Sequence, residues 1–203
     1  GVGTERAWDL CEEMGMPRII FVNKVDKENV DIGSVIQEIK ERFSKSACVI
    51  KMPFSPELTE TIAESDDALL EKYLEGKDIK EDEIKQALKN AVATGKIFPV
   101  ILGSAFSGAG VKELLDAIVD DLPSPLERKP VSACDPRTKE PKEIKLSEDA
   151  PFSAFVFKSV FDSFVGQLTL LRIFSGKLAS NTGFYNVNKG VKERIGSFLI
   201  LQG

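Results

Sequence analysis

A short polar run follows an apolar stretch near the start of the chain. Residues 18–22 read Arg-Ile-Ile-Phe-Val, and Asn23, Lys24, Val25 and Asp26 come directly after them. An ionised aspartate only accepts hydrogen bonds, so the Asp26 carboxylate matches two adjacent donors such as the N1–H and N2–H₂ edge of guanine, which adenine lacks. The run therefore predicts a guanine-selective loop. We expect the Lys24 stem to lie along the purine face, and the Asn23 amide to contact the base and tie neighbouring loops together.

A second polar loop follows a later apolar stretch, Phe98–Leu102, and reads Gly-Ser-Ala-Phe at residues 103–106. We expect the Ala105 backbone N–H to donate to guanine O6 and the Ser104 hydroxyl to support the Asp26 carboxylate. The two loops would then supply complementary halves of one base pocket. The predicted base-binding residues are Asn23, Lys24, Asp26, Ser104, Ala105 and Phe106.

A simpler explanation of the first loop stays open beside this one. Asp26 could cap the helix that follows it, with Lys24 merely solvated, because aspartate is a preferred N-cap residue. The presence of a second comparable loop at the end of another apolar stretch favours the base pocket over the cap.

The composition excludes several other kinds of chemistry. The 203 residues contain no histidine, so Ser-His-Asp triads, histidine general bases and histidine metal ligands are absent. The three cysteines, Cys11, Cys48 and Cys134, form no Cys-x-x-Cys pair and indicate reduced thiols in a cytoplasmic protein. The net charge of −5 argues against non-specific binding to DNA. No apolar run is long enough to span a membrane. We predict no catalytic and no metal-ligating side chain in this chain.

The apolar patterns alternate between helical and extended periods over residues 1–122. We expect strands at 18–22, 47–52 and 98–102, and helices at 4–14, 32–43, 57–94 and 111–122. Strands that alternate with helices indicate an α/β fold with a parallel sheet. Ligands bind at the carboxyl ends of the strands in such sheets, and both polar loops lie there.

The helical period also predicts which side chains face inward. Thr4 is the expected N-cap of the first helix, and Gly76 and Gly95 are expected helix ends. One apolar face of the first helix consists of Ala7, Leu10, Cys11 and Met14, and that of the last helix of Leu114, Leu115, Ile118, Val119 and Leu122.

The pattern changes in the last third of the chain. Residues 123–150 are polar, contain several prolines and read as a linker. Residues 151–203 then show strand-like patterns with a turn at 188–190, which predicts an antiparallel β-barrel-type segment that is too short to close. Unpaired sheet edges would leave this part poorly stable or prone to pair with another chain.

These motifs together resemble the translational GTPase family, and within it the elongation factor G group. The similar stretches cover nearly the whole chain: residues 18–26 for the guanine-specificity strand, 103–106 for the second base loop, 122–125 for the exit from the GTPase domain, and 166–176 with 185–196 for the second, β-barrel domain. The resemblance implies a parent protein that binds GTP or GDP with Mg²⁺, hydrolyses GTP on the ribosome and promotes translocation. It also implies that the β-domain faces ribosomal RNA.

The chain departs from the family pattern at the phosphates. The phosphate loop GxxxxGK[ST] is absent, because Ala109 stands where Gly103 and Gly108 would require lysine, and the magnesium-binding switch segments are missing too. We therefore expect a piece of a GTPase domain without its N-terminal part, which recognises the base but does not catalyse hydrolysis. The alternatives are a fragment of a ribosomal protection or release-type factor, and a non-catalytic ribosome-docking module with a GTPase-like fold.

Overall fold

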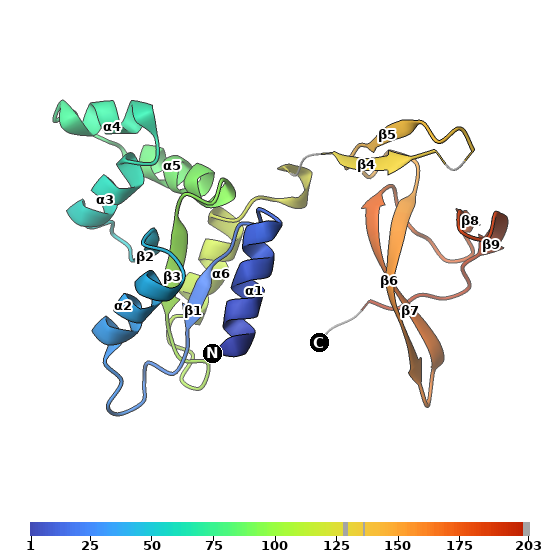
Figure 1. Ribbon diagram of the computed structural model, residues 1–203, viewed down its shortest axis with the longest axis horizontal. Coiled ribbons are helices and arrows are strands. Elements are labelled where there is room, and N and C mark those ends of the chain that lie inside the picture. The colour runs from blue at the N-terminus through green and yellow to red at the C-terminus, as the bar shows by residue number, and fades with distance from the viewer. Residues whose placement is uncertain (128–129, 136, 201–203) are drawn as a thin grey trace. The chain divides into compact units, whose positions relative to one another are not determined.

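The chain forms two compact units, Gly1–Pro123 and Ser124–Gly203, in the computed structural model, which describes residues 1–127, 130–135 and 137–200 (Figure 1). The first unit alternates helices with short strands, and the second is built from antiparallel hairpins. The elements of the first unit are α1 (Val2–Glu13), β1 (Ile20–Val22), α2 (Ile32–Arg42), β2 (Ala47–Val49), α3 (Pro56–Ala63), α4 (Asp67–Leu74), α5 (Glu81–Ala93), β3 (Phe98–Leu102) and α6 (Val111–Asp120).

The three strands of the first unit form a parallel sheet in the order β1-β3-β2. Ile20 pairs with Val100 and Val22 with Leu102, so β1 and β3 end at the same level. The central strand β3 is almost fully buried, and Val100 has no exposed surface. The predicted α/β fold with a parallel sheet is confirmed, and β3 has the predicted bounds.

Two apolar clusters hold the helices to the sheet. Side chains of α1 and α2 pack with Phe98 and Val100 in one cluster, whereas α3, α4 and α5 form the other around Ile62, Leu88 and Val92. In β2, Ala47 belongs to the first cluster and Cys48 contacts the second. This is the alternation expected of a strand covered on both faces.

The stretch expected to be helical from 57 to 94 is three helices. Ser55 caps α3 through the Leu58 N–H at 3.2 Å, and Asp66 caps α4 through the Leu69 N–H at 3.0 Å. Because Asp66 adopts an extended conformation to make this cap, the helix breaks there. Gly76 and Gly95 have φ angles of 67° and 71° and follow the ends of α4 and α5, as predicted.

The inward face predicted for the first helix is wrong. The helix starts at Val2 with Gly1 as the N-cap residue, so Thr4 lies inside it, and Leu10 and Met14 are 49% and 68% exposed. Trp8 faces the core instead, with its ring centroid 4.9 Å from that of Phe98. The Arg18 guanidinium covers the Trp8 ring at 3.9 Å, forms an ion pair with Glu12 and donates to the Trp8 carbonyl at 3.2 Å. A cation–π contact that periodicity does not reveal therefore orients α1.

The inward face predicted for the last helix is also wrong in part. Ala117 is buried, but Leu115, Ile118 and Val119 are 58%, 44% and 76% exposed. Their spacing does place them on one face of α6, as expected. That face is therefore left largely uncovered by the described part of the chain.

The second unit contains three antiparallel hairpins, formed by β4 (Val131–Cys134) with β5 (Pro141–Ile144), β6 (Ser153–Asp162) with β7 (Gly166–Ser175), and β8 (Gly183–Asn186) with β9 (Val191–Arg194). The short 3₁₀ helix η1 (Pro125–Glu127) precedes them. The predicted turn before Val191 is present, with Gly190 at a φ of 69°. The last described strand, β9, ends at Arg194, and residues 201–203 lie outside the described ranges.

The stretch predicted as a linker, residues 123–150, contains the hairpin of β4 and β5. The described strands of the second unit pair only two by two. The antiparallel prediction is therefore confirmed, and the hairpins do not join into a common sheet within the described part of that unit. None of the helices described is both long enough and apolar enough to cross a lipid bilayer.

One buried carboxyl sets a pH dependence for folding. Burial raises the pKa of Asp121, which is 7% exposed at the end of α6, from 3.8 to about 6, and the nearby Asp120 charge adds to the effect. Because this pKa is higher in the folded chain than in the unfolded chain, ionised Asp121 destabilises the fold. The free energy of unfolding falls as the pH rises from about 4 to 6. Above that range the loss amounts to roughly 3 kcal/mol.

We therefore predict that Asp121→Asn stabilises the chain at pH 8 by up to this amount, and that the gain shrinks as the pH falls to 5. Thermal and urea unfolding across this range measure the effect. Asp9→Asn, at an exposed position of α1, is the control and should change stability far less. An Asp121→Asn chain with wild-type stability at pH 8 would contradict the prediction.

Candidate functional site

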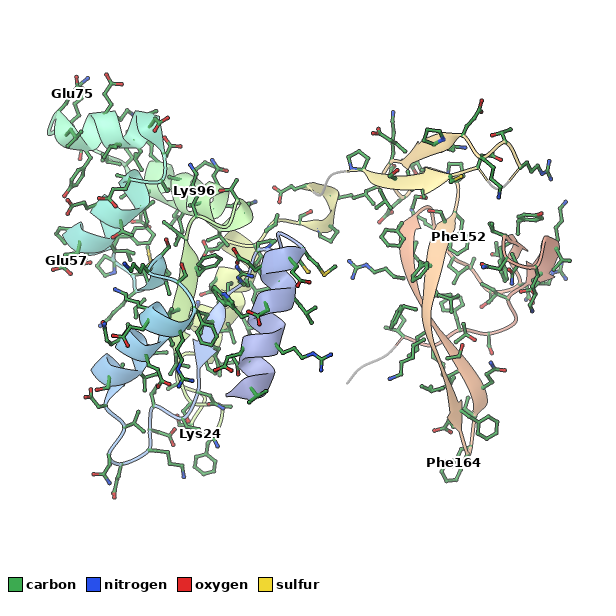
Figure 2. All side chains as sticks on the ribbon, in the orientation of Figure 1. Lys24, Glu57, Glu75, Lys96, Phe152 and Phe164 are labelled. Atoms are coloured by element: carbon green, nitrogen blue, oxygen red, sulfur yellow. The ribbon has the colours of Figure 1, made fainter. Side chains whose placement is uncertain are left out.

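The loop after β1 is tightly organised around Asn23. The Asn23 Oδ1 accepts a hydrogen bond from the Lys24 N–H at 2.8 Å, and Lys24 itself has a φ of 68°. This left-handed conformation is uncommon for a residue with a side chain, and Asn29, Lys139 and Asn181 adopt it elsewhere in the described part of the chain. Figure 2 labels Lys24 in this loop, where its side chain is exposed.

The loop after β3 closes on itself. The Ser104 N–H donates to the Ala109 carbonyl at 2.8 Å, and the Gly108 N–H donates to the Ser104 carbonyl at 2.9 Å. A Cβ at Gly103 would lie 2.4 Å from the Ala109 carbonyl oxygen and 2.7 Å from Cζ of Phe21. Only glycine fits this position without displacing the loop.

The backbones of the two loops are joined directly. The Gly103 N–H donates to the Val22 carbonyl at 3.0 Å, and the Val25 N–H donates to the Gly103 carbonyl at 3.2 Å. These bonds continue the parallel pairing of β1 and β3 beyond the last strand residues. The loops consequently lie side by side at one edge of the sheet.

The Asn23 side chain adds a further link between the loops. The Asn23 Oδ1 accepts a second hydrogen bond, from the Ala105 N–H at 2.9 Å. Hydrogen bonding from the Ser104 hydroxyl is the main cause that lowers the pKa of the Asp26 carboxyl below its ordinary 3.8, with smaller contributions from the Asp26 backbone N–H and Lys27. Partial desolvation opposes this shift. Asp26 is therefore an anion at neutral pH.

The structure thus brings together all six residues predicted for the base pocket. Ser104 is buried, with 1% exposure, whereas Phe106 is 96% exposed and Asn23, Lys24, Asp26 and Ala105 lie at the surface as well. One detail differs from the expectation: the Ala105 N–H, predicted as the donor to guanine O6, is bonded to Asn23.

Two other features of the site were not predicted. The contact of Phe21 with Gly103 and the backbone bond of Val25 both position the loops. A glycine immediately after an apolar strand was the sequence signal for the contact between Phe21 and Gly103. The backbone hydrogen bond of Val25 cannot be recognised from side-chain patterns.

The simpler explanation of Asp26 as a helix cap is wrong. The N-cap of α2 is Asp31, whose Oδ1 accepts from the Gly33 N–H at 3.0 Å and the Ser34 N–H at 3.3 Å. Asp26 lies five positions earlier in the chain, and the cap position of this helix is already filled. The Asp26 carboxylate therefore does not cap α2 and can accept hydrogen bonds from other donors.

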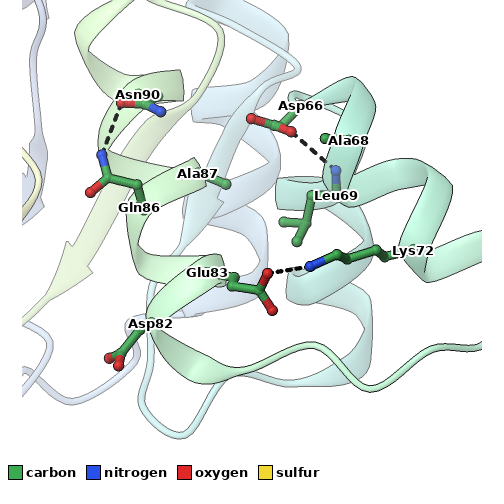
Figure 3. A pocket seen from close by; sticks show the side chains of 9 residues that line it. All are labelled: Asp66, Ala68, Leu69, Lys72, Asp82, Glu83, Gln86, Ala87 and Asn90. Carbon is green, nitrogen blue, oxygen red and sulfur yellow. Dashed lines mark hydrogen bonds and ion pairs between the residues drawn. The ribbon is translucent and has the colours of Figure 1, made fainter.

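A different concave surface lies between α4 and α5, with a cavity volume of about 350 Å³ (Figure 3). Lys72 forms an ion pair with Glu83 there, and Asp66 and Asp82 add two more carboxylates to the lining. None of the base-loop residues lines this cavity. Its excess of acidic groups would repel a nucleotide, so the loops at the ends of β1 and β3 are the candidate site.

Comparison with known proteins finds a matching family model and a similar solved structure. The family model described as the elongation factor Tu GTP binding domain matches residues 2–124, a range that includes both loops. A crystal structure of a protein from Thermus thermophilus is similar to this chain, with a TM-score of 0.73 and 28% sequence identity. The match covers 96% of this chain and 32% of that protein, so this chain spans about a third of its length.

The link between Ser104 and Asp26 can be tested without any ligand. We predict that Ser104→Ala raises the pKa of the Asp26 carboxyl toward its ordinary value, because the main stabilising hydrogen bond is lost. A ¹³C NMR titration of the Asp26 carboxyl measures this. Ser107→Ala is the control, since that hydroxyl accepts from the Ala109 N–H at 3.4 Å instead. An unchanged Asp26 pKa in Ser104→Ala would show that the hydroxyl does not support the carboxylate.

Proposed function

The chain belongs to the elongation factor Tu GTP-binding domain family, and from this premise we propose that it binds the guanine base of GTP or GDP at the ends of β1 and β3. The observation that carries the proposal is the pairing of the two loops through the Gly103 backbone and the Asn23 side chain, which leaves the anionic Asp26 carboxylate at the surface. A preassembled acceptor of this kind costs little ordering when a ligand binds.

In this proposal each exposed group has one role at the base. Asp26 accepts from the guanine N1–H and N2–H₂, a donor pair that adenine does not offer. The Lys24 stem and the exposed Phe106 ring offer apolar surface to the purine. Ser104 is buried and supports Asp26 without reaching the base.

The motifs favour a more specific assignment within the family. We propose a piece of an elongation factor G-type protein of the cytoplasm, with residues 1–122 as the later part of the GTPase domain and 151–203 as the start of the β-barrel domain that meets ribosomal RNA. The parent would hydrolyse GTP on the ribosome and promote translocation. The stretches at 18–26, 103–106, 122–125 and 166–176 support this proposal.

The residues present do not fit the Mg²⁺ that the family uses. The Mg²⁺ beside a nucleotide is held by the phosphates and by one or two protein oxygens of the phosphate loop and switch segments, and this sequence contains none of these segments. Phosphoryl transfer depends on groups placed around the phosphates and the metal, and the sequence has no phosphate loop. We therefore assign hydrolysis to the parent protein and base recognition to this chain.

Base recognition without phosphate contacts should be weak but selective. We predict that this chain binds GTP with a dissociation constant of roughly 1 mM, in the range that a few hydrogen bonds provide, and does not bind ATP detectably. Titrations followed by ¹⁵N NMR measure both affinities on the residues of the two loops. A micromolar affinity for GTP, or equal shifts with ATP, would contradict the proposal.

The role of Asp26 predicts a change of base preference. Asp26→Asn replaces an acceptor with an amide that also donates, so GTP binding should fall roughly tenfold or more and binding of xanthosine triphosphate should rise. The same NMR titration compares the two nucleotides. Asp31→Asn is the matched control, because asparagine caps a helix as well as aspartate and Asp31 caps α2. Unchanged GTP binding in Asp26→Asn would remove Asp26 from the site.

A further inference from the structure

The Phe21 ring lies on the opposite face of the sheet from the side chains of its neighbours in β1. Ile20 and Val22 pack against the apolar cluster formed with α1 and α2, and side chains alternate between the two faces of a strand. Within the described ranges, Phe21 is not a member of either apolar cluster of the first unit, and it is half-buried. Neither core therefore explains why a large ring stands here.

The parallel register places this ring against the start of the second base loop. Phe21 is the partner of Ile101 in β3, and Gly103 follows two residues later on the same face. Such a diagonal neighbour is within reach of an aromatic side chain. A Cβ on Gly103 would lie 2.7 Å from Cζ and 2.8 Å from Cε2 of Phe21. The outer edge of the ring thus occupies the space that a side chain at position 103 would need.

Gly103 is the residue through which the backbones of the two loops are paired. Its N–H donates to the Val22 carbonyl at 3.0 Å, and its carbonyl accepts from the Val25 N–H at 3.2 Å. Because glycine has no side chain to restrict its backbone, its neighbours must hold it in place. The Phe21 ring does this together with the Ala109 carbonyl, which lies close to the same Cβ position. A shorter side chain at position 21 would leave space into which Gly103 can move.

The position of Gly103 also sets that of the buried Ser104 hydroxyl. Ser104 follows Gly103 directly, and its N–H is bonded to the Ala109 carbonyl at 2.8 Å, so these residues move together. Hydrogen bonding from Ser104 is the main cause that lowers the pKa of the Asp26 carboxyl. The protonation of Asp26 is therefore sensitive to the packing of the second loop.

We propose that Phe21 is a positioning residue for base binding, whose ring edge holds Gly103 and with it residues 103–109 in the geometry that the base site needs. This inference rests on the proposed function. In this role Phe21 does not contact the base and acts through Gly103 and Ser104. A displacement of about 1 Å is enough to impair a binding site, so a small movement of Gly103 has a measurable effect.

Substitutions of Phe21 that differ in reach test this role. Leucine has no atoms at the positions of Cζ and Cε2, so Phe21→Leu should lower the affinity for GTP roughly three- to tenfold. Methionine is longer and flexible enough to reach Gly103, so Phe21→Met should stay within about twofold of the wild type. ¹⁵N NMR titrations of the whole 203-residue chain measure these affinities. Ile20→Val, on the opposite face of β1, is the control and should bind GTP as the wild type does.

The Asp26 carboxyl provides a second readout that needs no ligand. In Phe21→Leu its pKa should rise toward the ordinary value, as measured by ¹³C NMR titration, whereas Ile20→Val should leave it unchanged. In a Ser104→Ala background, Phe21→Leu should have no further effect on this pKa, because the hydroxyl through which the ring acts has been removed.

The outcomes separate this inference from the proposed function. Leucine and methionine have similar volumes, so a role of Phe21 in apolar packing alone would change GTP binding equally in both variants and would overturn the inference. An Asp26 pKa that Phe21→Leu does not change would overturn it as well. If GTP shifts no resonance of the two loops in the wild type, the proposed function itself fails, and the pKa measurement still decides whether Phe21 positions Ser104.

Discussion

The candidate site depends on the parallel pairing of β1 with β3. Because Val22 lies opposite Leu102, the next residue of each strand starts a loop at the same level of the sheet. The backbone bonds of Gly103 with Val22 and Val25 carry the pairing past the strands. A shift by one residue would turn every side chain to the other face and separate Asn23 from Ala105. The position of all six site residues is thus set by a short run of backbone hydrogen bonds.

Much of this arrangement was predictable because apolar runs and polar loops are local features of the sequence. β3 and the turn before Val191 were found in place, and the two loops were expected at one sheet edge since parallel strands end together. The helix end at Gly76 was also predicted, but the break before Asp66 was not. α3 ends at Ala63 and Asp66 caps the start of α4, although the apolar period continues through this break. Local hydrogen bonding there overrides a pattern that burial alone would extend.

Periodicity predicts which residues share a face but not what covers that face. On α1 the face that packs against the sheet carries Trp8, whose ring contacts both Arg18 and Phe98. Leu10, in contrast, is half exposed. On α6 the apolar stripe around Ile118 was recognised correctly, yet it is exposed. The information that decides both cases lies in contacts between residues distant in sequence. Patterns within one helix do not contain it.

The same limit applies inside the binding motif. A sequence motif shows which hydrogen-bond donors and acceptors are available. For Ala105 it suggests a backbone N–H that has no acceptor within the protein. The fold brings Asn23 within 2.9 Å of that N–H and occupies it. Polar groups in closely packed loops satisfy one another wherever geometry permits, since an unpaired donor is costly. The selectivity of such a site is therefore a difference between hydrogen bonds made to the ligand and those made within the protein. In the proposed site, the larger share of this selectivity is assigned to Asp26, whose carboxylate lies at the surface.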